Sequence, residues 1–334
     1  MTESFRIKNS VFFAWTRVSR RSEQLARHFN SAFIRYNRWG NSTLTLLFSL
    51  IVNFIRTFLW IVFKRPAIIF TFNAHPFVTI SAKLGTWVTM KGQVIPDLHT
   101  AAYTDHFSGM QAILGRWIWK KSPVVLVHNL ESKIFLSEKI PDIEDKLFVL
   151  EDALPGFDQE QIKSKSKSPN CVLISRFAPD EPIQEFFDAV SGIMNCHFFI
   201  TGNQKKAKFD LSPYADKNIT FSGFVSDQDY LCLLRSADFI TILTKRDMTL
   251  LSGGYEALAL EKPVILSETQ TLMDYFEDSA IYTPNTVDGI QEAVKMMLDE
   301  LEKRGKRVQC LKEKKIIEWN KKARELHSIV ESLA

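Results

Sequence analysis

Short apolar runs alternate with helix-forming stretches along both halves of this chain, and this alternation constrains the fold more than any other feature. The runs in the first half are Val11–Trp15, Ala32–Tyr36, Ala67–Thr71, Gln93–Asp97, Val124–His128 and Leu147–Leu150. Those in the second half are Cys171–Ser175, His197–Thr201, Ile219–Ser222, Phe239–Leu243, Val264–Leu266 and Ala280–Tyr282. Such alternation is typical of parallel α/β sheets, because helices cover both faces and the strands are apolar throughout. The sequence predicts an α/β protein with two doubly wound parallel sheets.

A polar tract divides the chain. Lys163–Ser168 reads K-S-K-S-K-S, which a core strand could not contain, and we place the linker there. We therefore predict an N-terminal domain of residues 1–160, a C-terminal domain of residues 161–298 and a helical segment of residues 299–334, anchored by Trp319 and Leu326. The chain has 334 residues, enough for two domains of ordinary size. Helices are predicted in the first domain at Arg20–Phe29, Thr43–Phe63, Pro76–Met90, Phe107–Lys120 and Glu131–Lys139.

Charge is unevenly distributed along the chain. The net charge is only +4, but the first forty residues hold many cations: Arg6, Lys8, Arg17, Arg20, Arg21, Arg27, Arg35 and Arg38, against Glu3 and Glu23. No motif for nucleic-acid binding accompanies them, so an anionic membrane surface is the expected partner. The four cysteines are scattered and form no CxxC pair, which indicates reduced thiols in a cytoplasmic protein.

One segment, Leu44–Phe63, has the length and apolarity of a membrane span. Asn53 and Arg56 interrupt its middle, and a central arginine costs about 2.5–3.5 kcal/mol on insertion. Polar residues recur in it at three- and four-residue steps and form one stripe on an apolar helix. We predict a domain helix with a membrane-facing side rather than a span.

The stretch Thr249–Ser267 carries the clearest chemical signal. Two glycines, Gly253 and Gly254, precede a helix predicted to open at Tyr255, and a helix start of this kind favours a bound anion. Glu256 follows one turn into the helix and can accept hydrogen bonds from a sugar hydroxyl. The combination suits a nucleotide diphosphate, although a glycine turn before an ordinary helix would read the same way.

The surrounding residues resemble GT-B glycosyltransferases, in particular the large retaining group called family 4. The motifs that carry the resemblance are Gly253-Gly254-Tyr255-Glu256-Ala257-Leu258-Ala259, Lys262-Pro263-Val264-Ile265, Ser175-Arg176-Phe177-Ala178-Pro179-Asp180-Glu181, Phe198-Phe199-Ile200-Thr201-Gly202, Phe221-Ser222-Gly223-Phe224-Val225-Ser226 and Ser236-Ala237-Asp238. The loop that begins at Arg176 is also similar to that of the β-1,4-mannosyltransferases that extend lipid-linked chitobiose. The resemblance covers about residues 169–297 well and the first half more loosely.

The resemblance implies two Rossmann-like domains that face a central cleft. The donor-binding residues that it implies are Gly202, Phe224, Val225, Thr249, Ser252, Gly253, Gly254 and Glu256, with Arg176 as the cation that stabilises the departing diphosphate. The chain departs from the family in two places. Met248 stands where the family has a second glutamate, and Glu181 and Pro182 occupy the region of a usual lysine.

In a doubly wound sheet, ligands bind beyond the carboxyl ends of the strands. Asp97, His99 and Asp105 cluster after one strand of the first half, and Asn73 follows another. We expect Asp97 and His99 to be catalytic, with His99 as a proton acceptor. We expect Asn73, Asp105, Arg17, Arg20 and Arg21 to contact the acceptor, the arginines through a phosphate. For each of these residues alone, capping or a solvated surface position is an equally good interpretation.

The sequence thus predicts a metal-independent glycosyltransferase without a cofactor, acting in polysaccharide biosynthesis. It would transfer a sugar from a nucleotide-diphospho-sugar to a lipid-linked or cell-surface glycan acceptor, at the cytoplasmic face of the membrane and without nucleic acid. The alternative is a non-catalytic GT-B subunit that binds a nucleotide or scaffolds a membrane complex. A nicotinamide-dependent oxidoreductase is disfavoured because no G-x-G-x-x-G follows a strand.

Overall fold

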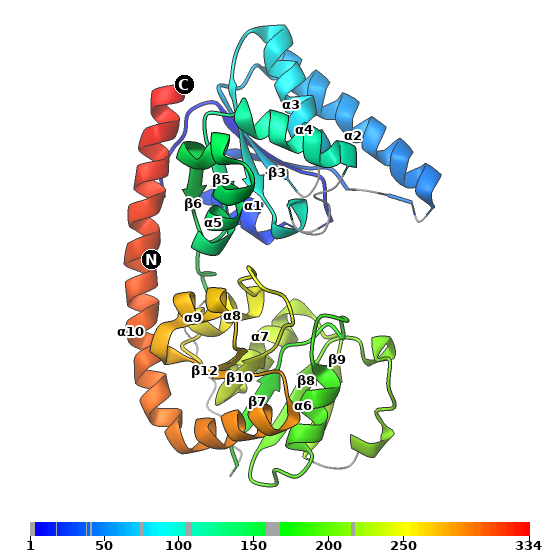
Figure 1. The fold of residues 1–334 in the computed structure, drawn as a ribbon, viewed down its shortest axis with the longest axis vertical. Coiled ribbons are helices and arrows are strands. Elements are labelled where there is room, and N and C mark those ends of the chain that lie inside the picture. Colours follow the sequence, from blue (N-terminus) through cyan, green and yellow to red (C-terminus); the bar gives the residue numbers. More distant parts are fainter. Residues whose placement is uncertain are drawn as a thin grey trace. The chain divides into compact units, whose positions relative to one another are not determined.

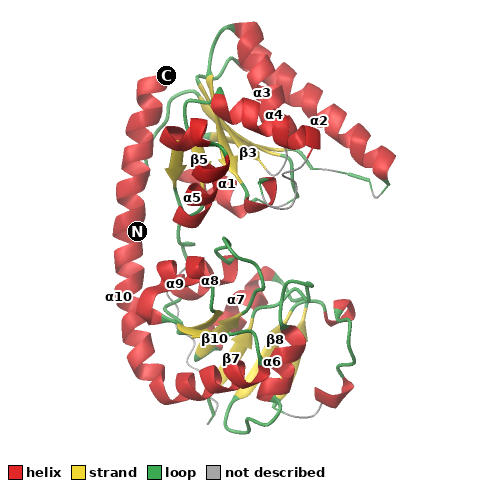
Figure 2. Ribbon diagram, viewed as in Figure 1, coloured by secondary structure: helices red, strands yellow, loops and turns green. Residues whose placement is uncertain are grey.

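The computed structural model describes residues 4–17, 19–37, 39–40, 42–73, 76–103, 109–157, 168–214 and 218–334. They form two compact units (Figure 1). Unit 1 consists of Met1–Ala153 and Ile316–Ala334, and unit 2 of Leu154–Lys315. In each unit, helices lie on both faces of a six-stranded parallel sheet, drawn in yellow in Figure 2. The α/β class and the two doubly wound sheets predicted from the sequence are confirmed.

The sheet of unit 1 has the order β2-β1-β3-β4-β5-β6. Its strands are β1 (Ser10–Ala14), β2 (Ala32–Arg35), β3 (Ile68–Asn73), β4 (Gln93–Leu98), β5 (Val125–Val127) and β6 (Leu147–Val149). Its helices are α1 (Arg20–His28), α2 (Thr43–Lys64), α3 (Pro76–Thr89), α4 (Gly109–Lys120) and α5 (Leu130–Lys139), with short 3-10 turns η1 (Thr100–Ala102) and η2 (Pro141–Lys146).

Neighbouring residues of these strands enter different cores, because side chains alternate between the two faces of a sheet. Phe12 and Phe70 pack with α1 and with the end of the last helix, near Trp319. Val11 and Ile69 pack on the opposite face, with α2 and α3. This two-sided burial explains why the strands are apolar at successive positions.

The sheet of unit 2 has the order β12-β11-β10-β7-β8-β9. Its strands are β7 (Asn170–Leu173), β8 (His197–Thr201), β9 (Ile219–Gly223), β10 (Phe239–Ile242), β11 (Val264–Ser267) and β12 (Ile281–Thr283). Its helices are α6 (Ile183–Val190), α7 (Asp227–Ser236), α8 (Ser252–Ala259), α9 (Gln270–Phe276) and the turns η3 (Gln204–Lys206), η4 (Ser212–Tyr214) and η5 (Glu277–Ser279). β7 lies between β10 and β8, so the loops after β7 and β10 are neighbours although they are far apart in the sequence.

The last helix, α10 (Val287–Leu333), contributes its first part to unit 2 and its last part to unit 1. Its residues Ile290 and Val294 are buried against the unit 2 sheet. Trp319 is buried in unit 1, where its indole Nε1 donates to the carbonyl of Glu151 over 3.0 Å. The helix is continuous through residue 299, where the sequence suggested a segment boundary. The N-terminal segment of unit 1 ends at Ala153, whereas the sequence suggested a boundary at residue 160.

All twelve predicted strands are present with bounds within two residues of the prediction. The helix expected to open at Tyr255 begins at Ser252 instead, so Gly253 and Gly254 lie in its first turn. Both glycines are buried: a Cβ on Gly253 would lie 2.8 Å from Ile174 Cδ1, and one on Gly254 would lie 2.7 Å from Phe276 Cζ. Close packing therefore accounts for both glycines, and the prediction that the helix starts after them is wrong.

Candidate functional site

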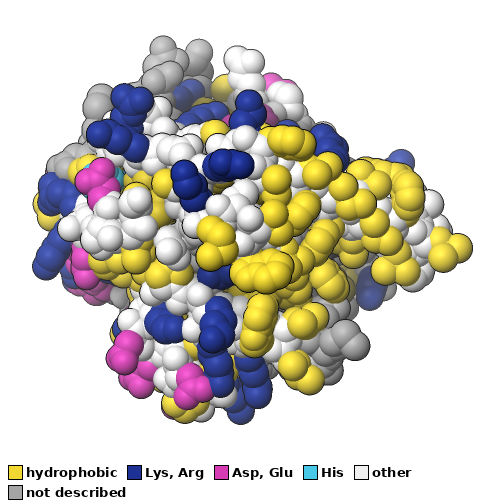
Figure 3. All heavy atoms as spheres, turned by 90° about the horizontal axis from the view of Figure 1, so that it is seen from above, with side chains coloured by type: hydrophobic (Ala, Val, Ile, Leu, Met, Phe, Trp, Pro, Cys, Tyr) yellow, Lys and Arg dark blue, Asp and Glu magenta, His cyan; other side chains and the backbone are white. Residues whose placement is uncertain are grey.

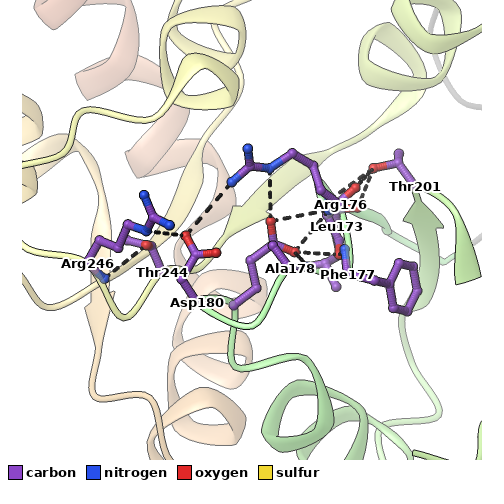
Figure 4. Close-up of polar contacts among 10 residues, drawn as sticks. Leu173, Arg176, Phe177, Ala178, Asp180, Thr201, Thr244 and Arg246 are labelled. Carbon is purple, nitrogen blue, oxygen red and sulfur yellow. Dashed lines mark hydrogen bonds and ion pairs between the residues drawn. The ribbon is translucent and has the colours of Figure 1, made fainter. Parts of the chain in front are cut away.

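In unit 2, the carboxylate of Glu181 organises the loop after β7. Figure 4 labels Arg176, Phe177, Ala178 and Asp180 of this loop. Glu181 Oε2 accepts hydrogen bonds from the hydroxyl of Ser175 (2.8 Å), the backbone N–H of Arg176 (2.9 Å) and that of Ala178 (3.4 Å). Arg176 Nε also lies 3.4 Å from Glu181 Oε1. The Glu181 carboxylate thus accepts the hydrogen bonds of this loop and fixes its conformation. The exposed Arg176 side chain extends from the same loop.

The same loop is fixed to the neighbouring strand β8. Thr201 Oγ1 accepts the backbone N–H of Ser175 over 3.0 Å and donates to the carbonyl of Leu173 over 3.2 Å. Gly202 follows with φ +93°, and a Cβ there would lie 2.3 Å from the carbonyl oxygen of Ser175. Only glycine allows this close approach of two loops.

Two guanidiniums meet at one carboxylate across the adjacent strands. Asp180 Oδ2 lies 2.9 Å from Arg246 Nε and 3.8 Å from Arg176 Nη2 (Figure 4). Arg246 follows β10, and its backbone N–H donates to Thr244 Oγ1 over 3.1 Å. The two arginines are partly exposed and lie at the carboxyl edge of the sheet, where doubly wound folds bind ligands.

Glu256, in α8, is buried, and the hydroxyl of Tyr230 in α7 donates to its Oε2 over 2.7 Å. The phenol fixes the orientation of the carboxylate. Ser252, at the start of α8, is exposed.

The other predicted donor residues differ in exposure. Phe224, after β9, has 93% of its surface exposed, which is unusual for a phenylalanine and suits a group that stacks on a ligand. Val225 and Thr249 are half-buried, and the hydroxyl of Thr249 donates to the carbonyl of Asp247 over 3.0 Å.

A cavity of about 390 Å³ lies behind the loop after β7, between α6 and the η3 region. Its lining includes Phe177, Glu181, Lys206, Phe209 and Lys245. None of the residues expected to bind the donor lines it.

In unit 1, Arg21 and Asp97 form an ion pair. Both side chains are buried, with Arg21 Nη2 2.9 Å from Asp97 Oδ1 and Arg21 Nη1 2.6 Å from Asp152 Oδ1. The two carboxylates raise the pKa of Arg21 against the opposing effect of its burial. This arrangement differs from the open phosphate site and the accessible acid that the sequence suggested for Arg21 and Asp97.

His99 follows β4 and is half-buried beside the rings of Phe72 and His128, with centroid distances of 5.5 and 5.9 Å. Its backbone N–H donates to the carbonyl of Asn73, a buried residue at the end of β3. His128 Nε2 lies 3.7 Å from Asp97 Oδ1. Burial, with the charge of Arg21, lowers the pKa of His128 well below its ordinary value. His128 is therefore neutral at pH 7.

The predicted arginine cluster is divided by the structure. Arg17 and Arg20 are exposed, whereas Arg21 points into the unit. Asp105 lies outside the described residues. Within the described ranges, no group of His, Cys, Asp or Glu side chains is arranged to hold a metal ion.

No protein-family model and no curated protein matches this sequence. Solved structures do match it along nearly its whole length. A glycosyltransferase from Rickettsia africae superposes with a TM-score of 0.74 at 15% identity, covering 99% of this chain and 98% of that one. HepE from Anabaena, solved with UDP-glucose, gives 0.71 at 12% identity, covering 96% and 99%. Sucrose-phosphate synthase from Thermosynechococcus elongatus gives 0.71 at 13% identity, also covering 96% and 99%.

The chain has the GT-B fold. The resemblance drawn from the sequence motifs is confirmed at this level.

Some residues of this GT-B chain were missed by reasoning from sequence. Arg246 lies two residues before Met248, and its charge after a predicted strand was a signal that could have been used. Tyr230 and Asp152, the partners of Glu256 and Arg21, carried no such signal, because only the order of strands and helices in the GT-B units brings them to their partners.

Proposed function

We propose that this protein transfers a sugar from a nucleotide-diphospho-sugar to a lipid-linked or cell-surface polysaccharide acceptor. One observation supports this most: in a GT-B unit, two guanidiniums and a buried, oriented carboxylate come from neighbouring loops and helices at the carboxyl edge of the sheet. HepE, similar in fold, was solved with UDP-glucose.

The diphosphate would be bound by Arg176 and Arg246. Both guanidiniums share Asp180, and a diphosphate with two negative charges would compete with that carboxylate for them. Arg246 would supply the second positive charge that related enzymes take from a lysine, whose region here contains Glu181. Catalysis would follow from stabilising the charge that develops on the departing diphosphate, together with the N-terminus of α8. We propose that this proceeds without a metal ion.

The ribose would be held by Glu256. Because Tyr230 already fixes one carboxylate oxygen, the acid presents a defined acceptor to sugar hydroxyls without losing rotational freedom on binding. Phe224 would stack on the nucleobase.

The acceptor would bind unit 1. His99 lies at the carboxyl edge of β4 and would accept the proton of the acceptor hydroxyl, and Asn73 supports the His99 backbone. The exposed cations Arg17 and Arg20 would meet an acceptor phosphate. We place the protein in the cytoplasm, peripherally on the inner face of the membrane.

A second candidate is a non-catalytic subunit that binds a nucleotide or scaffolds a membrane complex. Met248 in place of a glutamate favours it, as does the pairing of Arg176 with Asp180 and Glu181.

A thermal-shift series with UDP-, GDP- and ADP-sugars tests the binding part of the proposal. A ligand that binds only the native state at one hundred times its Kd adds about 2.7 kcal/mol of stability. We expect one nucleotide class to raise the midpoint selectively. In Glu256→Ala, a tenfold loss of affinity would reduce the added stability by about half at the same ligand concentration, and a larger loss would reduce it further. Release of free nucleoside diphosphate from that donor then separates the two candidates: turnover supports the transferase, and binding without turnover supports the subunit. No stabilisation by any nucleotide sugar would contradict the transferase and the nucleotide-binding subunit, and would leave only the scaffold.

A further inference from the structure

Helix α2 has its polar and apolar sides reversed relative to an ordinary helix of a water-soluble domain. Its buried residues are Ser49, Asn53, Thr57 and Ile61, three of them polar. Its exposed large side chains are Leu44, Leu47, Phe48, Ile51, Ile55, Leu59 and Phe63. In water such an arrangement leaves the apolar surface hydrated and places the polar groups inside, the opposite of what the hydrophobic effect favours.

Most of the inward polar stripe is hydrogen-bonded within unit 1. Asn53 Nδ2 donates to the carbonyl of Asn37 over 3.4 Å, whereas the buried Asn53 Oδ1 has no hydrogen-bond partner among the described residues. Trp15 Nε1 donates to Thr57 Oγ1 over 3.1 Å, and the backbone N–H of Trp39 donates to Ser49 Oγ over 3.1 Å. Arg56, the cation in the middle of the helix, lies 4.1 Å from the centre of the Tyr36 ring. The side chains that argued against a span in the sequence therefore have partners within unit 1.

The apolar surface continues onto the two neighbouring helices, since α3 packs against both α2 and α4. Exposed large side chains on these elements are Leu84, Trp87, Val88, Met90, Ile113 and Trp117, with Trp87 73% and Met90 84% exposed. We call this surface of α2, α3 and α4 the apolar face. Figure 3 shows hydrophobic side chains gathered over a broad area of the molecule, with Lys and Arg beside it.

The segment that contains α2 and α3 carries positive charge and no carboxylate, although Lys120 at the end of α4 is paired with Asp142. Between Glu23 and Asp97 the sequence contains no acidic residue. The cations of the same stretch and of α4 include Lys64, Arg65, Lys91, Arg116, Lys120 and Lys121, all exposed. Exposed apolar side chains with cations beside them are complementary to an anionic bilayer. The acyl region accepts the apolar side chains, and the anionic headgroups attract the cations.

We propose that the apolar face is a membrane-docking surface that inserts into the headgroup and acyl boundary of an anionic bilayer. In this mode α2 lies in the plane of the membrane and does not cross it. In the described chain α2 is the one helix long and apolar enough to span a membrane by length and composition. Spanning would expose its polar stripe to lipid and would separate it from α3, whose Gly85 fits against Ile61 so closely that a Cβ would lie 2.8 Å from Ile61 Cγ2.

This docking surface goes beyond the proposed sugar transfer, because membrane binding by the apolar face does not require that any sugar be transferred. If both hold, the surface would bring unit 1 to the bilayer that carries a lipid-linked acceptor.

Vesicle co-sedimentation tests the proposal with the full chain. The test variant is the double substitution Trp87→Ser with Trp117→Ser, and the matched control is Met194→Ser with Ile317→Ser, two apolar residues of similar exposure elsewhere. Circular dichroism and thermal melting check that both variants are folded. We expect the parent protein and the control to bind phosphatidylcholine vesicles that contain phosphatidylglycerol, and much less to bind phosphatidylcholine alone. The test variant should lose about tenfold or more in partition coefficient.

Four results would overturn the proposal. The parent protein could stay in the supernatant with anionic vesicles, or the test variant could bind as well as the control. The protein could instead form a dimer in lipid-free buffer that the test variant dissociates, which would make the apolar face an interface between copies. Finally, extraction from native membranes by detergent but not by alkaline carbonate would show that α2 spans the bilayer.

Discussion

Arg21 and Asp97 form a buried ion pair in which two nitrogens of one guanidinium face one carboxylate, with Arg21 Nε 2.9 Å from Asp97 Oδ2 and Nη2 2.9 Å from Oδ1. Asp152 completes the set through Arg21 Nη1. The pair joins the first turn of α1 to the end of β4. Through Asp152, Arg21 also contacts the segment that follows β6. One arginine thus fixes three segments at the edge of the sheet where the acceptor is proposed to bind.

We expect Arg21→Ala to destabilise the protein by about 3–5 kcal/mol, because it leaves two carboxylates of a buried network without their cation. Arg20→Ala is the matched control: its side chain is exposed, and the expected change is within about 0.5 kcal/mol. Urea unfolding of both variants measures the difference. Equal stability of the two variants would show that the pair is not structural.

We expect Arg246→Ala to weaken binding of the nucleotide sugar about tenfold or more, since a charge-assisted hydrogen bond contributes about 1.5–3 kcal/mol. Asp180→Asn should bind at least as tightly as the parent, because it removes the carboxylate that competes for both arginines. Lys245→Ala is the neighbouring control, since Lys245 is paired with Glu185 instead. Calorimetric titration with the stabilising nucleotide compares them. Unaltered affinity in Arg246→Ala would remove Arg246 from the site.

Arg176→Ala and Glu256→Ala should each lower donor affinity about tenfold or more, for the diphosphate and the ribose respectively. Tyr230→Phe should have a smaller effect, because it keeps the carboxylate and loses only the hydrogen bond that orients it. The same calorimetric titration compares the donor affinities of the three variants. If both alanine variants are folded and bind the donor normally, the site assignment is wrong.

The lowered pKa of His28 predicts how the free energy of unfolding depends on pH. It is buried beside Trp319, with ring centroids 4.2 Å apart, and burial lowers its pKa to about 4. Between pH 4 and the ordinary value of 6.5, the unfolded chain therefore binds more protons at this residue than the folded chain does. Acidification through this window should lower the free energy of unfolding, by at most about 1.4 kcal/mol per pH unit from His28.

The measurement is urea unfolding at several pH values from 4.5 to 7.5 for the parent protein and His28→Leu. In the variant, the free energy of unfolding should depend less steeply on pH. The pH dependence that remains includes the contribution of His128, whose pKa is also lowered. An unchanged slope in His28→Leu would mean that His28 titrates normally in the folded state.

The strands, most of the helices and the GT-B resemblance could be predicted from the sequence alone, because each depends on local periodicity and on motifs that neighbouring residues carry. The run Val264–Leu266 is apolar at each position since helices cover both faces of its sheet, and this is visible without knowing the other strands. The apolar exterior of α2 was also foreseen, since the polar stripe through Asn53 is a property of one helix.

Only the tertiary structure decided which charged side chains meet. Asp180 reaches Arg246 because β7 and β10 are paired in the sheet, and Arg21 reaches Asp97 because α1 begins beside the end of β4. Strand order rearranges the chain, so distance along the sequence carries no information on these partners. Tertiary packing likewise placed α3, which carries Trp87, against both α2 and α4, and so made one apolar face from three helices that are separate in the sequence. Which side chains pair with each other depends on the assembled fold, and local patterns in the sequence do not predict it.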